Sequence, residues 1–338
     1  MPHLAIVGAT GAVGSLMRRV VLERKLPYQS IKFLASARSA GQTIEFAGKQ
    51  YKIEALSPEA FRGVELVLSS TPASVSKEWS PIAARAGAYV VDNSSAWRMD
   101  PGVPLVVPEV NAHALKSIPK KIIANPNCST IQMVVALQPL HAIARIKRVV
   151  VSTYQASSGK GATGLFDLDA QVAALGQGKT VPAPTAHTEQ LAGNVIAHDW
   201  KLGDDGYSEE EIKMVKETKK IMGDESILVA PTTVRVPVRT GHSESINLEF
   251  HSAISVEQAK AALAKAPGII LMDGYGPGLV PTPLQAEDRD EVFVGRVRKD
   301  PTVPFGLQIW VVADNLRKGA ATNAVHIAQE LIKQGIVK

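Results

Sequence analysis

The chain has only one cysteine, Cys128, among its 338 residues. A single cysteine cannot form an internal disulfide, so a disulfide-stapled secreted fold is excluded and a reducing compartment is indicated. The sequence also lacks an apolar run of membrane-spanning length, and Leu4–Val7, before Gly8, are too few apolar residues for a signal peptide. We therefore expect a cytosolic protein that does not cross a membrane.

Signatures of nucleic-acid binding are also missing, although the net charge is +5. There is no arginine-rich arm and no recognised nucleic-acid motif. The main basic concentration, Lys213–Lys220, contains Glu217 and follows Glu209–Glu211, a pattern typical of the solvated face of a helix. We expect no nucleic-acid partner.

The size and composition favour an enzyme with two domains around a cleft. A chain of 338 residues is too long for one compact core of usual size. Apolar residues make up 45% and charged residues 20%, the balance of an ordinary globular protein. No internal repeat or low-complexity segment is present.

The first third of the chain predicts a parallel, doubly wound sheet. Short apolar runs are separated by segments long enough for crossover helices. The runs that we interpret as strands are Leu4–Val7, Ile31–Ala35, Leu66–Ser69 and Tyr89–Asp92, and Ala12–Leu22 reads as a helix.

After Cys128 the expected strands are longer and closer together, which predicts a second, α+β domain. These strands are Ile146–Gln155, Ile227–Val238, Ser243–His251, Glu291–Val297 and Leu307–Ala313. Two helices are also predicted. The first, Glu209–Met222, has capping-box spacing between Ser208 and Glu211, and Gly223 can end it. The second runs from about Asn315 to Leu331 and contains small residues that permit close packing. The segment Gly176–Ala186, with two prolines, is expected to be a loop.

A glycine pattern follows the first strand and opens the first helix. Its spacing is GxxGxxG, from Gly8 through Gly11 to Gly14. Backbone N–H groups at such a helix start can bind a pyrophosphate, whereas the alternative is a tight strand–helix turn that needs glycine only for packing. The position inside a βαβ pattern favours a Rossmann-like dinucleotide site.

The segment after the second strand favours NADP over NAD. An NAD site usually has an acidic residue about 20 residues beyond the glycines. Here the sequence offers Ser36, Arg38 and Ser39 and no carboxylate, so a 2′-phosphate would be attracted rather than repelled. The alternative interpretation is an ordinary polar loop with a solvated arginine.

Cys128 lies in an Asn- and Pro-rich turn just before the helix-compatible run Ile131–Leu137. A cysteine at a helix start experiences the positive end of the helix dipole, which favours the thiolate. Such a nucleophile suits an aldehyde or an acyl phosphate, because thiohemiacetal and thioester intermediates separate hydride transfer from acyl transfer. An inert buried thiol is the alternative.

The remaining chemistry needs an acid–base group and cations for an anionic substrate. His242, after Gly241 at a bend between two strand-like runs, is the candidate acid–base group. Arg98 and Arg235 are candidates for binding carboxylate or phosphate with paired hydrogen bonds. Glu217 and Lys220 share a helix face and could bind an amine and an anion, although salt bridging along the helix is the usual explanation.

Together these motifs resemble the aspartate-semialdehyde dehydrogenase family along essentially the whole chain. They occur in family order, and they are Gly8–Gly14, Val91–Ser95 with Arg98, Asn125–Thr130, Thr153–Ala156, Glu217–Lys220 and Arg235–Ser245. The chain differs from the usual pattern at Thr71–Ala73, Trp97 and Lys160.

The resemblance implies a role for each candidate residue. Cys128 would be the thioester-forming nucleophile, His242 the general acid–base group and Gln155 a substrate-orienting residue. Arg235 would bind the substrate carboxylate and Glu217 its amino group. The phosphate-binding residues would be Arg98, Asn127 and Lys220. The NADP contacts would be Gly8, Thr10, Gly11, Ala12, Val13, Gly14, Ser36, Arg38, Ser39, Ser158, Gly159 and Asn315.

The resemblance also implies an architecture and a reaction. Residues 1–127 would bind NADP, residues 128–314 would form the catalytic and dimerisation domain, and residues 315–338 would be a C-terminal helix that completes the first domain. The enzyme would interconvert L-aspartate 4-semialdehyde, phosphate and NADP⁺ with 4-phospho-L-aspartate and NADPH, on the route to lysine, methionine and threonine. A homodimer with no metal site is expected.

Two alternatives remain from the sequence. N-acetyl-γ-glutamyl-phosphate reductase shares the architecture and the use of a cysteine with a histidine. However, it has glycine before the cysteine and tyrosine after it, where this chain has Asn127 and Ser129. A catalytically silent homologue acting as a binding protein would have lost reactive positions. Here Cys128, Gln155, Arg235 and His242 are all present.

Overall fold

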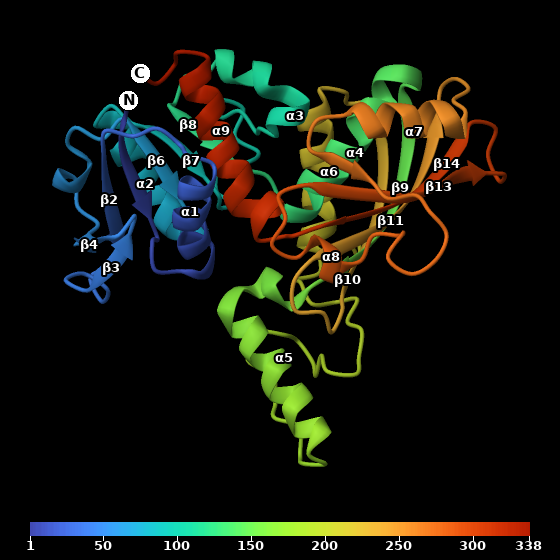
Figure 1. Cartoon of the computed structure of the whole chain (residues 1–338), viewed down its shortest axis with the longest axis horizontal. Coiled ribbons are helices and arrows are strands. Elements are labelled where there is room, and N and C mark those ends of the chain that lie inside the picture. The colour runs from blue at the N-terminus through green and yellow to red at the C-terminus, as the bar shows by residue number, and fades with distance from the viewer. The chain divides into compact units, whose positions relative to one another are not determined.

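A computed structural model describes all residues from Met1 to Lys338. The chain forms two compact units (Figure 1). The first comprises Met1–Pro126 together with Ala320–Lys338, and the second comprises Asn127–Gly319. The predicted limits were 127/128 and 314/315, whereas these two units place Asn127 and residues 315–319 in the second unit.

The first unit is built on a six-stranded, all-parallel sheet in the order β5-β2-β1-β6-β7-β8. Its strands are β1 (His3–Val7), β2 (Ser30–Ala35), β5 (Glu54–Ala55), β6 (Leu66–Ser69), β7 (Tyr89–Asp92) and β8 (Ile122–Ala124). The four predicted strands are confirmed, because each is a short apolar run buried in the sheet. The order runs outward from β1 in both directions, and ligands of such sheets bind at the carboxyl ends of the strands around this switch point.

Helices and a small hairpin complete the first unit. The helices are α1 (Ala12–Glu23), α2 (Ala73–Arg85), α3 (Pro108–Asn111) and α9 (Thr322–Lys333), and the hairpin pairs β3 (Thr43–Phe46) with β4 (Lys49–Lys52). The C-terminal helix α9 contacts α1 and the strands β6 and β7, so the end of the chain packs into the N-terminal unit. The hairpin was not predicted, and it is anchored by Phe46 and Tyr51 against Phe33.

The second unit contains a six-stranded mixed sheet in the order β10-β9-β11-β14-β13-β12. Its strands are β9 (Ile146–Gln155), β10 (Leu228–Arg235), β11 (His242–Phe250), β12 (Ile269–Leu271), β13 (Val292–Asp300) and β14 (Gly306–Ala313). The five predicted strands are confirmed within a few residues. The α/β fold class with a second α+β domain is therefore confirmed.

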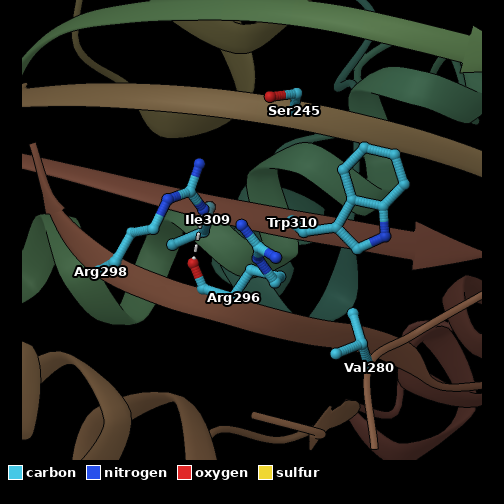
Figure 2. A pocket seen from close by; sticks show the side chains of 6 residues that line it. All are labelled: Ser245, Val280, Arg296, Arg298, Ile309 and Trp310. Atoms are coloured by element: carbon cyan, nitrogen blue, oxygen red, sulfur yellow. Dashed lines mark hydrogen bonds between the residues drawn. The ribbon is translucent and has the colours of Figure 1, made fainter. Parts of the chain in front are cut away.

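One face of this sheet is covered by helices and the other is open. The helices of this unit are α4 (Cys128–Ala144), α5 (Gly161–Gly176), α6 (Glu209–Met222), α7 (Val256–Lys265) and α8 (Pro283–Ala286). The helices α4, α6 and α7 pack on the sheet, and α4 also contacts both α6 and α7 (Figure 1). Partly exposed residues alternate along the central strands, which marks the open face, and a cavity of about 360 Å³ lies there (Figure 2).

The helices of this unit differ from the prediction in three respects. The helix α5 was not predicted. The helix α6 has the predicted limits and capping box, and Gly223 ends it with a φ of 64°. Its solvated face includes the exposed Lys216, as predicted, but not Glu210, Glu211 and Glu217, which are buried. The helix expected from Asn315 begins instead as a π-helical stretch, Arg317–Ala321, before α9.

No helix in the structure combines the length and the apolar character needed to cross a membrane.

Candidate active site

Cys128 is the first residue of α4. Asn127 caps this helix, because its Oδ1 accepts hydrogen bonds from the backbone N–H groups of Ser129 (3.1 Å) and Thr130 (3.2 Å). The thiol therefore lies at the positive end of a 17-residue helix, and the dipole favours the thiolate there. Cys128 is partly exposed, as a nucleophile must be.

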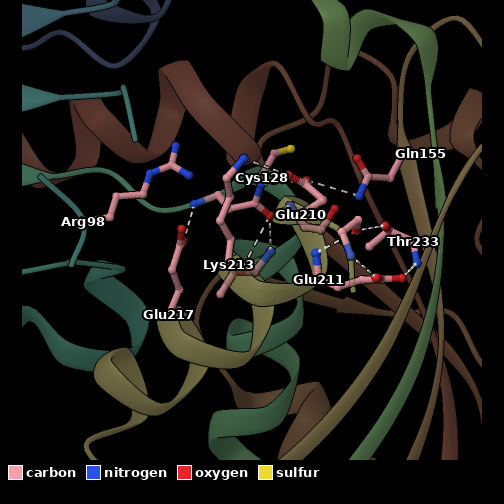
Figure 3. Close-up of polar contacts among 12 residues, drawn as sticks. Arg98, Cys128, Gln155, Glu210, Glu211, Lys213, Glu217 and Thr233 are labelled. Carbon is pink, nitrogen blue, oxygen red and sulfur yellow. Dashed lines mark hydrogen bonds and ion pairs between the residues drawn. The ribbon is translucent and has the colours of Figure 1, made fainter. Parts of the chain in front are cut away.

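Two carboxylates of α6 hold the start of α4 in place (Figure 3). The backbone N–H of Asn127 donates to Glu217 Oε2 at 2.6 Å, and its side-chain amide donates to Glu210 Oε1 at 2.8 Å. The polar groups of Asn127 are thus engaged in positioning Cys128. Its expected contact with phosphate stays a prediction.

His242 lies beside the thiol. Its Nε2 is 3.3 Å from Cys128 Sγ, while its Nδ1 accepts a hydrogen bond from the backbone N–H of Ala156 at 3.0 Å. With Nδ1 as acceptor, the proton of the neutral ring is on Nε2 and faces the sulfur. Burial, together with the charge of Arg235, lowers the pKa of His242 well below its usual value, so the ring is neutral at physiological pH.

Two glycines make room for this pair. A Cβ on Gly319 would lie 2.7 Å from Cys128 Cβ, so the close packing expected of this small residue is confirmed. A Cβ on Gly159 would lie 2.8 Å from Arg235 Nη1 and 3.5 Å from His242 Nε2. Gly159, predicted as a cofactor contact, therefore also allows the chain to pass close to the arginine and the histidine.

Gln155 ends β9 and is buried. Its amide nitrogen lies 3.3 Å from both Glu210 Oε1 and Thr153 Oγ1. These contacts fix the orientation of the amide and leave Oε1 without a hydrogen bond within the protein. The free carbonyl oxygen suits the predicted role of orienting a substrate, which stays a prediction.

Arg235 ends β10 and is only 1% exposed. Its Nε donates to Asp199 Oδ2 at 2.8 Å and its Nη1 donates to the carbonyl oxygen of Ala156 at 2.6 Å. The ring of Trp200 lies 4.6 Å from the guanidinium carbon. Only Nη2 has no protein partner, so one edge of the guanidinium remains to bind a carboxylate.

Asp199 is the centre of a buried polar cluster behind Arg235. It also accepts hydrogen bonds from His187 Nδ1 and the backbone N–H of Thr188, both at 3.1 Å, and Lys160 Nζ lies 3.6 Å away. Burial alone would raise the pKa of Asp199, but the hydrogen bonds from His187 and Arg235 outweigh it and hold this pKa well below the usual range. Asp199 therefore stays ionised and neutralises Arg235.

Two of the other predicted substrate residues lie on α6 and the third lies in the first unit. Glu217 is buried on α6 and Lys220, on the same helix, is half-buried. In the first unit, Arg98 donates from Nε to the carbonyl oxygen of Asn125 (3.0 Å) and from Nη2 to that of Asn93 (3.1 Å). These two bonds hold the guanidinium of Arg98 in one orientation.

The glycine loop of the first unit has the geometry of a dinucleotide site. Gly8 has a φ of 77°, and an added Cβ would lie 2.1 Å from the carbonyl oxygen of Ser70. A Cβ on Gly14 would lie 2.1 Å from the carbonyl oxygen of Gly8. Gly11 has ordinary space, and α1 has no side-chain cap. The N–H groups of the first turn, at Ala12, Val13 and Gly14, are therefore available to a pyrophosphate.

The residues expected at the adenosine end form a turn after β2. Ser36 and Arg38 are exposed there and Ser39 is half-exposed, and Arg38 has no hydrogen bond or ion pair. In the second unit, the predicted contacts Ser158 and Asn315 hydrogen-bond to each other at 2.9 Å. Asn315 Oδ1 also accepts from the backbone N–H of Gly241.

The sequence did not reveal the residues that orient these groups. Asp199 lies in an irregular segment, 36 residues from its partner Arg235, and no local pattern marks it. Glu210 lies two turns before Glu217, on the helix face that was identified, so its position could have been found from helical spacing.

Comparison with known proteins agrees with this geometry. Residues 3–118 match the family model "Semialdehyde dehydrogenase, NAD binding domain", and residues 137–318 match "Semialdehyde dehydrogenase, dimerisation domain". The chain is 53% identical to the aspartate-semialdehyde dehydrogenase of Aquifex aeolicus, over 99% of both chains.

Two solved structures extend the comparison. Aspartate semialdehyde dehydrogenase II of Vibrio cholerae, complexed with ASA, is 44% identical and matches with a TM-score of 0.95 over 98% of each chain. The Candida albicans enzyme with NADP is 26% identical and matches with a TM-score of 0.78 over the full length of both chains. This chain belongs to the aspartate-semialdehyde dehydrogenase family.

Proposed function

We propose that the chain catalyses the reversible, NADP-dependent conversion of 4-phospho-L-aspartate to L-aspartate 4-semialdehyde and phosphate. The observation that carries this proposal is the Cys128–His242 pair, with 3.3 Å between Sγ and Nε2 at the start of α4. The aspartate-semialdehyde dehydrogenases to which the chain is similar support the choice of substrate.

In the reductive direction the Cys128 thiolate attacks the acyl phosphate, a C–S bond forms, and the bond to the phosphate oxygen breaks. NADPH supplies the hydride that reduces the resulting thioester. The oxyanion of the thiohemiacetal then expels the thiolate, which releases the aldehyde and restores Cys128. Arg98 and Lys220 carry the positive charge expected to stabilise the departing phosphate.

His242 acts as a hydrogen-bond donor in this scheme. Its Nε2–H faces the sulfur and can stabilise first the thiolate and then the oxyanion. Full proton uptake by the ring would place a proton on Nδ1 and break its bond with the Ala156 N–H. The predicted general acid–base role stays a prediction, and the geometry favours donation from a neutral ring.

Substrate recognition is assigned to one cationic, one anionic and one amide side chain of the second unit. Arg235 offers Nη2 to the α-carboxylate, because its other donors are bound to Asp199 and Ala156. Glu217 would accept hydrogen bonds from the amino group, and Gln155 would orient the reacting group through Oε1. Both signs of charge match an amino acid.

Phosphate-dependent reduction of NADP⁺ with aspartate semialdehyde tests the proposal. The parent should be active and Cys128→Ala should have no measurable activity. Ser129→Ala is the matched control, because Ser129 Oγ makes no hydrogen bond and its loss should change the rate little. An inactive parent, or an active Cys128→Ala variant, would refute the proposal. Activity with N-acetylglutamate semialdehyde instead would favour the alternative reductase.

The NADP preference rests on the turn that contains Arg38. Its unpartnered guanidinium and the two neighbouring serines form a place for the 2′-phosphate. Arg38→Ala should raise the KM for NADP⁺ about tenfold or more and leave the KM for NAD⁺ unchanged. An equal effect on both dinucleotides would remove Arg38 from this role.

The partner of the open sheet face is a second copy of the chain. This face presents Tyr154 and Trp310, with ring centroids 5.6 Å apart, next to the cavity in Figure 2. Phe166 and Val172 on α5 are also exposed, by 71% and 53%. Analytical ultracentrifugation should give twice the mass of the 36.0 kDa chain, and Trp310→Asp should reduce it. The cytosolic location stays a prediction.

A further inference from the structure

A second pair of polar side chains lies behind the Cys128–His242 pair. Gln132 follows Cys128 by four residues on α4, so both side chains lie on the same side of the helix. Glu244 follows His242 by two residues on β11, so both side chains lie on the same face of the sheet. Gln132 and Glu244 are almost completely buried.

Gln132 links the element that carries the nucleophile to the element that carries the histidine. Its Nε2 donates to the backbone carbonyl oxygen of His242 at 3.3 Å. A change in the orientation of the Gln132 amide would therefore alter the position of the His242 backbone relative to α4. The distance between Sγ and Nε2 depends on that position.

The other atoms of this pair lack partners. Gln132 Oε1 and both carboxyl oxygens of Glu244 are buried and make no hydrogen bond. An ionised Glu244 would leave a buried charge without compensation, which is very costly. Burial raises the pKa of Glu244 well above its usual value. A weaker polar interaction with the neighbouring Gln132 side chain acts in the opposite direction. The side chain is thus a neutral carboxylic acid with one O–H to donate.

Two adjacent acceptor groups are satisfied together only when one of them carries a proton. We propose that the O–H of Glu244 donates to Gln132 Oε1 and that this buried pair is a positioning device, which sets Cys128 Sγ against His242 Nε2. The inference rests on the proposed roles of Cys128 and His242. Neither Gln132 nor Glu244 contacts the reacting atoms, so both act through the histidine.

Substitutions that keep or remove the donor separate this role from others. Glu244→Gln retains an N–H donor toward Gln132 Oε1, so its kcat should stay within about threefold of the parent. Glu244→Leu keeps the bulk but has no donor, and kcat should fall about 10- to 100-fold with KM nearly unchanged, because small displacements of reacting groups have effects of this size. Glu249→Gln, an ion-paired glutamate farther along β11, is the control and should match the parent.

The rate of Cys128 alkylation by iodoacetamide, measured against pH, gives a readout that a loss of stability alone would not move. Glu244→Leu should shift the thiolate titration to higher pH, because His242 Nε2–H no longer faces the sulfur correctly, and Glu244→Gln should not. Gln132→Leu should reproduce the shift. The double variant, Gln132→Leu with Glu244→Leu, should be no worse than either single variant.

Three outcomes overturn the inference: Glu244→Gln as impaired as Glu244→Leu, a parent-like Glu244→Leu variant, or additive effects in the double variant. If Glu244→Leu does not fold, Glu244→Gln and Gln132→Leu still decide between the outcomes. Loss of activity in Cys128→Ala together with parent-like Gln132 and Glu244 variants would reject the inference and keep the proposed function.

Discussion

The strongest test of the substrate site is Asp199→Asn. This substitution keeps the size of the side chain and removes the negative charge that faces Arg235. Arg235 Nε lies 2.8 Å from Asp199 Oδ2, and the two side chains are 2% and 0% exposed. The variant would leave a buried guanidinium without its counter-charge. The new amide N–H₂ is itself a donor, so it could not accept the hydrogen bonds that one carboxylate oxygen now receives.

The expected loss of stability follows from this burial. Removing one partner of a buried ion pair costs about 3–5 kcal/mol, whereas domains are usually stable by about 5–15 kcal/mol. Unfolding in urea at pH 7 should show this loss. The substrate site should suffer as well, because a charged hydrogen bond contributes about 1.5–3 kcal/mol, which corresponds to a fall of about 10- to 150-fold in kcat/KM.

The pH dependence of the loss can be stated with its sign. Hydrogen bonds hold the pKa of Asp199 below its usual value in the folded state, in spite of burial. Such a group stabilises the fold fully above the unfolded-state pKa, about 3.9, and loses this contribution as the pH falls. The stability gap between the parent and Asp199→Asn should therefore be constant from pH 6 to 8 and narrow below about pH 4.

Asp169→Asn is the matched control. Asp169 forms an ion pair with Arg239, but the two side chains are 48% and 58% exposed. Exposed pairs contribute less than about 1 kcal/mol, so this variant should have nearly the stability and kcat/KM of the parent. Equal behaviour of Asp199→Asn and Asp169→Asn would refute the assignment of Asp199 as the anchor of Arg235.

Further predictions concern backbone packing and helix capping. Gly14→Ala would place a Cβ 2.1 Å from the carbonyl oxygen of Gly8 and should lower the free energy of unfolding by about 1–3 kcal/mol. Gly11→Ala would make only an ordinary contact at 3.5 Å, so thermal melts of the two variants should differ, and equal melting temperatures would contradict the clash. Ser208→Ala removes the hydrogen bond that the Ser208 hydroxyl accepts from the Glu211 N–H in the capping box. The free energy of unfolding in urea should fall by about 0.5–2 kcal/mol. An unchanged urea midpoint would show that the cap is not needed.

The sequence was most informative where a local pattern determines the structure. Leu66–Ser69 and Tyr89–Asp92 were predicted with their observed limits, because short apolar runs bounded by polar residues form buried parallel strands. The limits of α6 followed from Ser208 and Gly223, whose capping roles are set by neighbouring residues.

Elements that depend on distant contacts were missed. The helix α5 begins at Gly161 and exposes Phe166, so its apolar residues do not form a single buried stripe that would reveal a helix. The burial of Glu217 was also unexpected, because its contact with the Asn127 backbone joins residues 90 positions apart. Chemistry and resemblance predicted the reactive groups, whereas the charged residues that hold them in place come together only in the tertiary structure.

The two hydrogen bonds from Asn127 to α6 have a consequence for folding. The start of α4 is tied to Glu210 and Glu217, which lie 83 and 90 residues later in the chain. The geometry around Cys128 therefore becomes complete only after α6, which ends at Met222 near the middle of the second unit, has docked on the start of α4. During refolding, the rate at which the single thiol reacts with a small alkylating agent should therefore report when this long-range contact forms.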